Sequence, residues 1–244
     1  MTGDVPANQT RQLFPNTRWS AVRAVKERSP GAAIALEAIC RAYWYPLYAY
    51  VRRCGQGPHD AEDLTQEFFR QLLEKGWLAA ADRNKGKLRT FLVVAMKHFM
   101  SKEWRKAVSQ KRGGGLAPAS FDTAFAETRF GADPTALAPE ETFDRQWALT
   151  LLDRTLNQLR EEFVAGGKAA DFDTIKGYLL APRGTIDYAA VALEIGGSEG
   201  AARVVVHRLR RRFCEIYREE VMRTLAEGEN LDEEIRHLAA ALAG

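Results

Sequence analysis

Apolar residues recur at steps of three and four along most of the chain, and this spacing restricts the fold more than any other feature of the sequence. The period matches the helical repeat of about 3.6 residues, so it gives each segment one apolar face. No run of five or more residues alternates convincingly between apolar and polar types, as a half-buried strand would. The valines at 204–206 come nearest, and they lie inside a helical pattern. The sequence therefore predicts an all-α fold.

Helix-breaking residues divide this pattern into two groups. Helices are expected over about 32–54, 60–75 and 87–110, and again from 142–165 onward. Between them lie a run of three glycines at 113–115, three prolines and no sustained pattern, which is typical of a linker. We therefore expect two small helical domains joined by a flexible linker. The expected divisions are a mobile tail at 1–18, a domain at 19–112, a linker at 113–142, a domain at 143–226 and a C-terminal helical extension at 227–244.

The net charge of +3 conceals strongly charged segments, because it is the difference between 35 basic and 32 acidic residues. The three cysteines have no CxxC spacing, so neither a disulfide framework nor a zinc site is indicated. The four histidines lack metal-binding spacing, and no glycine-rich phosphate loop precedes a strand. We expect no catalytic residues, no metal and no cofactor. A signal-peptide pattern and an apolar stretch of about 20 residues are both lacking, which predicts a cytoplasmic protein.

The second predicted domain contains the spacing of a helix-turn-helix. Ala192, Gly196 and Ala202 stand where two helices that cross closely need a small residue, a turn glycine and a packed residue. Gly196 or Gly197 can adopt a positive φ and end the first helix. Ser198 can cap the second helix by accepting a hydrogen bond from a free backbone N–H.

The helix that follows Ser198 is unusually basic. Residues 198–218 contain six arginines against two glutamates, a density that suits DNA phosphates and base edges in a major groove. Ala202, Val205, Leu209 and Phe213 are expected to face inward. The alternative is a solvated helix whose arginines pair with nearby acidic residues. The predicted duplex-binding residues are Ser198, Glu199, Arg203, His207, Arg208, Arg210 and Arg211.

A second basic segment lies at 97–112, where six cations and one anion are interleaved with two aromatic residues. Aromatic rings can stack on unpaired bases while cations follow the backbone, so this mixture suits single-stranded DNA. The alternative places the aromatic rings in the core and the cations in solvent. The predicted single-strand-binding residues are Lys97, Phe99, Lys102, Trp104, Arg105, Lys106, Lys111 and Arg112.

The helix expected at 60–75 has an acidic and polar face instead. Asp60 is the expected N-cap, and Gly76 is expected to end the helix. Negative charge repels nucleic acid, so this face predicts a protein partner. Its residues are Asp60, Glu62, Asp63, Gln66 and Glu67.

The segments "DAEDLTQEFFRQLLEKG", "LRTFLVVAMKHFMSKEWRKAVSQKR" and "YAAVALEIGGSEGAARVVVHRLRRRF" stand in the order found in sigma-70 factors. Together they resemble the extracytoplasmic-function (ECF) group of these RNA polymerase sigma factors. The resemblance implies that 19–112 is a region 2-like domain for the −10 element and 143–226 a region 4-like domain for the −35 element. It also implies that the acidic helix binds the β′ clamp helices of core RNA polymerase, and that the second domain contacts the β flap.

The chain departs from this family at Val204 and Val205, where a serine and an arginine are common. Arg203, His207 and Arg210 are therefore expected to carry more of the −35 contact. A separate anti-sigma factor stays open as a partner. The alternative function is a stand-alone helix-turn-helix repressor or activator, which would bind duplex DNA without polymerase.

The C-terminal segment after Ala226 begins with acidic residues and places Leu231, Ile235, Leu238 and Leu242 on one stripe. This pattern predicts a helix that packs against the protein. The alternative is a regulatory element that covers the basic face of the second domain or docks a partner.

Overall fold

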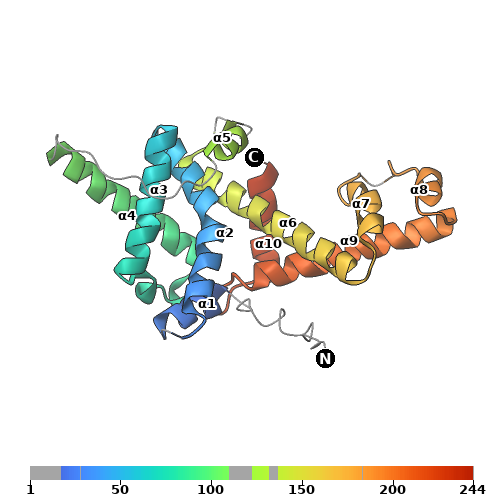
Figure 1. Ribbon diagram of the computed structural model, residues 1–244, viewed down its shortest axis with the longest axis horizontal. Coiled ribbons are helices and arrows are strands. Elements are labelled where there is room, and N and C mark those ends of the chain that lie inside the picture. The colour runs from blue at the N-terminus through green and yellow to red at the C-terminus, as the bar shows by residue number, and fades with distance from the viewer. Residues whose placement is uncertain (1–17, 28, 110–122, 132–136, 183, 244) are drawn as a thin grey trace, which may run out of the picture. The chain divides into compact units, whose positions relative to one another are not determined.

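The computed structural model describes residues 18–109, 123–131 and 137–243, except 28 and 183. Within these residues every regular element is helical and none is a strand, which confirms the all-α prediction (Figure 1). The same residues contain no helix with the length and apolar character needed to cross a membrane. The elements are α1 (Arg18–Lys26), α2 (Ala32–Arg53), α3 (Pro58–Glu74), η2 (Trp77–Ala80), η3 (Arg83–Lys85), α4 (Leu88–Ser109), α5 (Thr123–Gly131), α6 (Pro139–Ala165), α7 (Ala169–Ile175), η4 (Lys176–Tyr178), α8 (Tyr188–Glu194), α9 (Glu199–Met222) and α10 (Leu231–Ala243).

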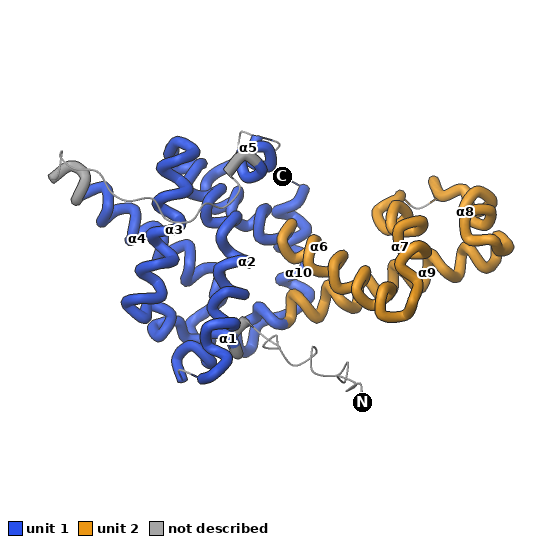
Figure 2. Tube along the Cα trace, viewed as in Figure 1, with its two compact units in different colours: residues 1–148, 223–244 blue, residues 149–222 orange. Residues whose placement is uncertain are grey.

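The chain divides into two compact units, coloured separately in Figure 2. Unit 1 comprises the described residues of 1–148 together with 223–244, and unit 2 comprises 149–222. The division falls within α6. Residues 227–244, expected as a C-terminal helical extension, are grouped with unit 1.

Unit 1 is organised around α2, which is buried along most of its length. Tyr43 of α2 stacks on Trp147 of α6, with ring centroids 4.4 Å apart. Phe68 of α3 meets Phe99 of α4 edge to face at 5.8 Å. Pro46 is buried and does not end α2, which continues on both sides of it. Aromatic side chains therefore link the helices of this core.

The start of α3 differs from the sequence prediction. The helix begins at Pro58 with Gly57 as its N-cap residue, so Asp60 lies inside the first turn instead of capping it. Proline suits this position because its missing N–H would have no helical partner there. At the other end the helix stops at Glu74, and Gly76 has a φ of +62°. The predicted C-terminal end is therefore confirmed.

Part of the expected linker forms a helix, α5, that is fastened to α2. The hydroxyl of Tyr48 donates to Glu127 Oε1 at 2.5 Å, and Arg52 donates to both carboxylate oxygens at 2.7 and 2.9 Å. The guanidinium groups of Arg52 and Arg53 lie over the ring of Phe130. The segment 123–131 is thus docked on unit 1.

Helix α10 is fastened to unit 1 through buried charges. Glu234 is 2% exposed and lies 2.5 Å from Lys87 Nζ and 3.2 Å from Arg89. Arg89 also lies 3.3 Å from Asp144, which contacts His237 of α10 at 3.1 Å. These contacts favour the packing-helix interpretation of the C-terminal segment.

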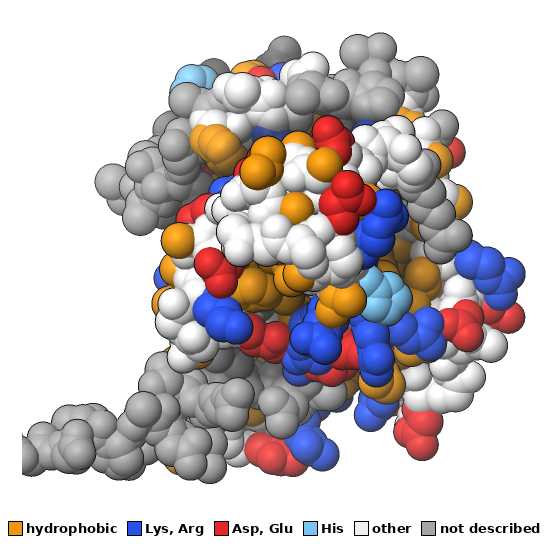
Figure 3. All heavy atoms as spheres, turned by 90° about the vertical axis from the view of Figure 1, so that its right-hand side faces the viewer, with side chains coloured by type: hydrophobic (Ala, Val, Ile, Leu, Met, Phe, Trp, Pro, Cys, Tyr) orange, Lys and Arg blue, Asp and Glu red, His pale blue; other side chains and the backbone are white. Residues whose placement is uncertain are grey.

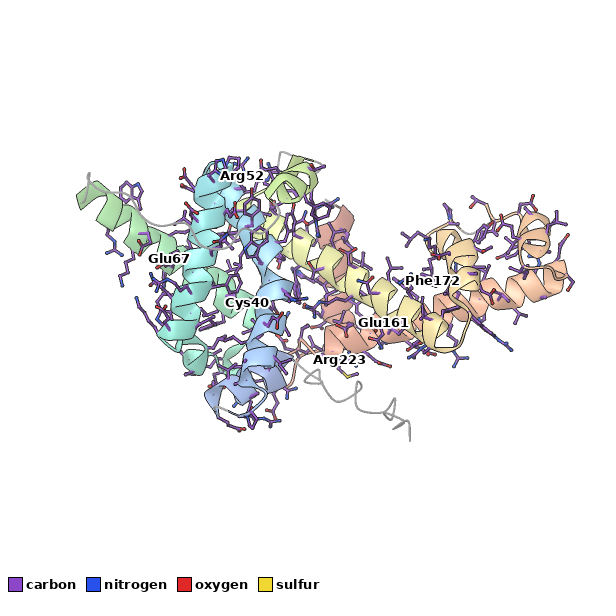
Figure 4. All side chains as sticks on the ribbon, in the orientation of Figure 1. Cys40, Arg52, Glu67, Glu161, Phe172 and Arg223 are labelled. Carbon is purple, nitrogen blue, oxygen red and sulfur yellow. The ribbon has the colours of Figure 1, made fainter. Side chains whose placement is uncertain are left out.

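Unit 2 has two apolar clusters. The larger one joins α6, α7 and α9 through Leu159, Phe172 and Leu209. Phe172 is labelled on α7 in Figure 4. The smaller cluster joins α8 to α9 and is formed by the side chains of Val191, Ala192, Ala202 and Val206.

Candidate nucleic-acid interface

The turn between α8 and α9 is built by local chemistry. Asp187 caps α8 by accepting hydrogen bonds from the backbone N–H groups of Ala189 and Ala190. Gly196 has a φ of +64°, which a residue with a Cβ rarely adopts. Ser198 Oγ accepts from the N–H of Ala201 at 3.2 Å and so caps α9, as the sequence predicted.

Small side chains let α8 and α9 approach closely. Ala202 is completely buried, and Ala192 is nearly so, in the cluster shared by the two helices. Val206 is more deeply buried than Val205, so the inward face of α9 is rotated slightly from the one expected. This packing fixes which side chains of α9 face solvent.

The solvent-facing side of α9 is basic. Arg203, His207, Arg208 and Arg211 are all exposed, and Figure 3 shows basic side chains gathered beside a histidine on the face to which α9 contributes. The guanidinium of Arg203 lies over the ring of Tyr188 at 4.3 Å, which orients it. Tyr188 was not singled out from the sequence, because the contact depends on how α8 crosses α9.

Of the acidic neighbours of these arginines, Glu199 is exposed and Glu215 is half-buried. Glu199 lies 3.7 Å from Arg203, and Glu215 accepts from Arg211 at 3.0 Å. The hydrogen bond from Arg211 lowers the pKa of the Glu215 carboxyl below its usual value. Exposed pairs of this kind contribute little to stability, so a phosphate can replace the carboxylate at small cost.

Arg210 was predicted to bind duplex DNA, but its side chain is engaged within the protein. Its guanidinium donates to the backbone oxygen of Tyr178 at 2.7 and 3.0 Å and to that of Ala181 at 2.5 Å. Tyr178 ends η4 and Ala181 follows it, so Arg210 holds this part of the chain against α9. The neighbouring Arg212 is likewise held by Glu162 of α6, at 2.6 Å. Both arginines bind the protein itself.

A second basic stripe runs along α4 in unit 1. Lys97, Lys102 and Arg105 are exposed, and Trp104 at the edge of the stripe is 69% exposed. Lys97 lies 3.6 Å from the exposed Glu140, and Arg105 donates to the carbonyl of Ser101 within its own helix. Of the other predicted residues, the side chain of Lys106 and all of Lys111 and Arg112 lie outside the described residues.

Phe99 is the second correction. It was predicted as a stacking platform, yet it is only 2% exposed and packs against Phe68 in the core of unit 1. An aromatic ring without solvent access cannot stack on a base. Among the described residues of this stripe, Trp104 is therefore the aromatic side chain that is exposed to solvent.

The acidic face of α3 is smaller than predicted. Asp60 and Asp63 are exposed, and Glu67 is half-buried and paired with Arg70. Figure 4 labels Glu67 on α3. Glu62 is only 8% exposed and accepts a hydrogen bond from Gln66 at 2.9 Å. Contrary to the prediction, it therefore does not form part of the exposed acidic face.

An open pocket of about 850 Å³ lies between α3 and α4. It brings together residues that were predicted for two different partners. The side chains that bear charge or an aromatic ring are Asp60, Asp63 and Glu67 on α3 and Glu103, Trp104 and Arg105 on α4. Glu67 is paired with Arg70, and the exposed carboxylates of Asp60 and Asp63 give the α3 side of the pocket a negative charge that suits a basic protein surface.

Comparison with known proteins relates one part of the chain to a family. Residues 40–110 match the family described as sigma-70 region 2. The match covers less than a third of the chain, and it contains α3, α4 and the pocket between them. Neither a search of curated proteins nor a search of solved structures found a match. The basic face of α9 lies outside the matched segment.

Proposed function

We propose that this chain is a sigma factor, which binds core RNA polymerase and directs it to promoters. The match of residues 40–110 to sigma-70 region 2 carries the proposal. The order of parts supports the ECF group of these factors, because a basic helix-turn-helix follows the matched segment after residues 113–142. The chain acts by binding and performs no covalent chemistry.

Core polymerase is the partner proposed for α3. The pocket between α3 and α4 is rich in carboxylates and includes the apolar side chains of Leu64 and Met100. Complementary charge steers association and fixes the register of a protein interface. The resemblance implies the β′ clamp helices as the surface that docks here.

Opening of the −10 element is the role proposed for α4. Trp104 offers an exposed ring beside the cations of the stripe, so it can stack on a base of the separated strand. Binding to the single strand alone shifts the equilibrium between closed and open DNA, because a ligand favours the state for which it has the greater affinity. No energy source is required for this step.

Recognition of the −35 element is the role proposed for α9. Its cap, its close packing on α8 and its exposed arginines resemble the recognition helix of a helix-turn-helix, which enters the major groove with its N-terminal residues. The same unit would contact the β flap of the polymerase.

The test is run-off transcription with purified core RNA polymerase on a library of genomic fragments. Transcripts are expected only when the full chain and the core enzyme are both present, and their start sites are expected to share two upstream elements at a fixed spacing. Asp63→Lys places a cation in the α3–α4 pocket and is expected to abolish these transcripts. Glu37→Lys, an exposed glutamate on α2 outside the pocket, is the matched control.

The competing function is a helix-turn-helix repressor or activator that acts alone. Such a protein would protect a palindromic duplex without polymerase, because dimeric regulators read two symmetric half-sites. A palindromic footprint by the chain alone, together with no core-dependent transcript, would replace the sigma-factor proposal.

A further inference from the structure

The centre of the exposed face of α9 is apolar. Gly200, Val204, His207 and Arg211 follow one another at steps of four, three and four residues, so they form one row along the helix. Val204 is 46% exposed within this row. Arg203 lies on one side of the row, and Arg208 lies on the other. An apolar side chain thus lies between two exposed arginines.

Val204 is not needed for the core of unit 2. Neither apolar cluster of the unit includes it, whereas the adjacent Val205 and Val206 each pack against one. A β-branched residue is also a weaker helix former than alanine, lysine or arginine. Local folding therefore does not account for an exposed valine at this position.

The surrounding charge indicates what this apolar centre meets. Arginines on both sides favour a polyanion, and Gly200 lacks a side chain that would keep that partner away from the row. In the major groove of DNA each base edge presents hydrogen-bond donors and acceptors, and thymine alone adds an apolar group, its C5-methyl. Contact between a methyl group and a valine side chain removes apolar surface of both from water, which lowers the free energy of the complex.

We infer that Val204 reads the C5-methyl group of a thymine in the upstream promoter element. This inference rests on the proposed function, because it requires α9 to enter the major groove of that element. Val204 is then a specificity-determining residue, and the flanking arginines supply affinity through phosphates or guanine edges. The preferred sequence contains a thymine at the position that faces the first two turns of α9.

Deoxyuridine provides the test, because it pairs as thymine does and lacks only the methyl group. A promoter obtained by run-off transcription is prepared as a series of duplexes, each with one upstream thymine replaced by deoxyuridine. Closed-complex affinity is measured for holoenzyme that contains the wild-type chain, Val204→Ala or Val164→Ala. Val164 is the matched control, since it is 49% exposed and lies on α6.

At one position, deoxyuridine is expected to weaken binding by wild type and by Val164→Ala about fourfold, the value of one buried methyl group. Val204→Ala is expected to bind the thymine duplex about fourfold less tightly and to show no further loss on the deoxyuridine duplex. If the loss from Val204→Ala and the loss from deoxyuridine were independent at every position, so that their fold-changes multiplied, the inference would be overturned. A Val204→Ala defect in binding core polymerase that does not depend on the DNA would also overturn it, because it would assign the valine to a protein partner.

These outcomes are distinct from failure of the proposed function. If core-dependent transcription and the two-element footprint persist while no methyl dependence is found, only the reading of thymine is wrong. If the chain supports no core-dependent initiation at all, the sigma-factor proposal is wrong, and the inference falls with it.

Discussion

Arg203 and Arg210 lie on the same helix and have different partners. Arg203 is exposed and oriented by the ring of Tyr188, whereas Arg210 donates to the backbone oxygens of Tyr178 and Ala181. The first can exchange its exposed acidic neighbour for a phosphate. If Arg210 turned toward DNA, the carbonyl groups of Tyr178 and Ala181 would lose the hydrogen bonds that it donates. One helix therefore presents one arginine to solvent and uses another to hold the fold.

Substitution of these two arginines separates the roles. Arg203→Ala is expected to weaken promoter binding and to reduce the slope of log affinity against log salt by about 1, with little change in Tm. Arg210→Ala is expected to lower the free energy of unfolding by about 1–3 kcal/mol, because two backbone carbonyls lose a charged donor. Salt-titrated binding and thermal denaturation of both variants measure the two effects. Equal changes in both measurements for both variants would contradict the distinction.

Trp104→Ala is expected to impair promoter opening and leave closed-complex formation unchanged. A stacked base contributes about 1–3 kcal/mol, and this contribution exists only when the strand is separated. Permanganate reactivity of unpaired thymines measures opening, and a binding assay at low temperature measures the closed complex. Phe125→Ala is the control, since Phe125 is also an exposed aromatic residue of unit 1. A loss of closed-complex affinity that matches the loss of opening would contradict the stacking role.

Individual side chains were the hardest features to predict from the sequence. The spacing of α4 correctly placed Lys97, Lys102 and Arg105 at the surface. The same spacing separates Phe99 from Trp104, because Leu92, Met96 and Phe99 follow one another at steps of four and three and are all buried, whereas Trp104 lies off this row. Glu62 is the harder case, since it lies at the edge of the buried face of α3 and its burial depends on the packing of that helix. Local periodicity fixes a face only to within about one residue.

At the scale of elements, helix α5 shows what sequence patterns leave out. Periodicity predicted the long helices α4 and α6 closely, because each buries a continuous stripe of its own residues. The segment of α5 lies among glycines and prolines and was assigned to a linker. Its position depends on Glu127 meeting Tyr48 and Arg52, which are 79 and 75 residues away in the chain. Contacts between residues so far apart in the sequence produce no local pattern from which the helix could be predicted.

The docking of α5 is expected to depend on pH. Hydrogen bonds from Arg52 and then Tyr48 lower the pKa of Glu127 below its usual value of 4.5. A carboxyl whose folded-state pKa is depressed stabilises the fold above its unfolded-state pKa and loses that contribution as pH falls through the folded-state value. Glu127→Gln is therefore expected to have a lower Tm than wild type at pH 7, and the difference is expected to shrink as pH falls below 4.5 and through the depressed folded-state pKa.

The control for α5 is Glu27→Gln, an exposed glutamate that follows α1 in unit 1. Thermal denaturation of the three proteins is measured from pH 7 to pH 3. A gap between wild type and Glu127→Gln that stays constant over this range would show that the carboxylate does not carry the docking of α5.

At the scale of the whole molecule, the chain returns to unit 1 after completing unit 2. Residues 223–244 belong to unit 1, where α10 is held by the ion pairs of Glu234 with Lys87 and Arg89. The sequence predicted this helix from its apolar stripe and did not predict its partners, since charged residues 145 and 147 positions apart carry no pairing signal. Both ends of unit 2 are therefore continuous with unit 1.

Breaking the buried pairs is expected to release α10. Glu234→Gln leaves Lys87 and Arg89 without their buried carboxylate and is expected to cost about 3–5 kcal/mol in the free energy of unfolding. Glu233→Gln changes an exposed neighbour on the same helix and is expected to have little effect. Limited proteolysis of the C-terminal segment and denaturant unfolding measure the difference. Equal stability and equal cleavage of the two variants would show that the buried pairs do not hold α10.

The central claim is that two cationic surfaces, on α4 and α9, act on promoter DNA only when α3 has bound core polymerase. Footprinting of one promoter by the chain alone, by core polymerase alone and by both together tests it most directly. The account predicts protection of two separated upstream elements, with reactive unpaired thymines at the downstream one, only in the complete mixture. Protection of the same sites by the chain without polymerase would contradict it.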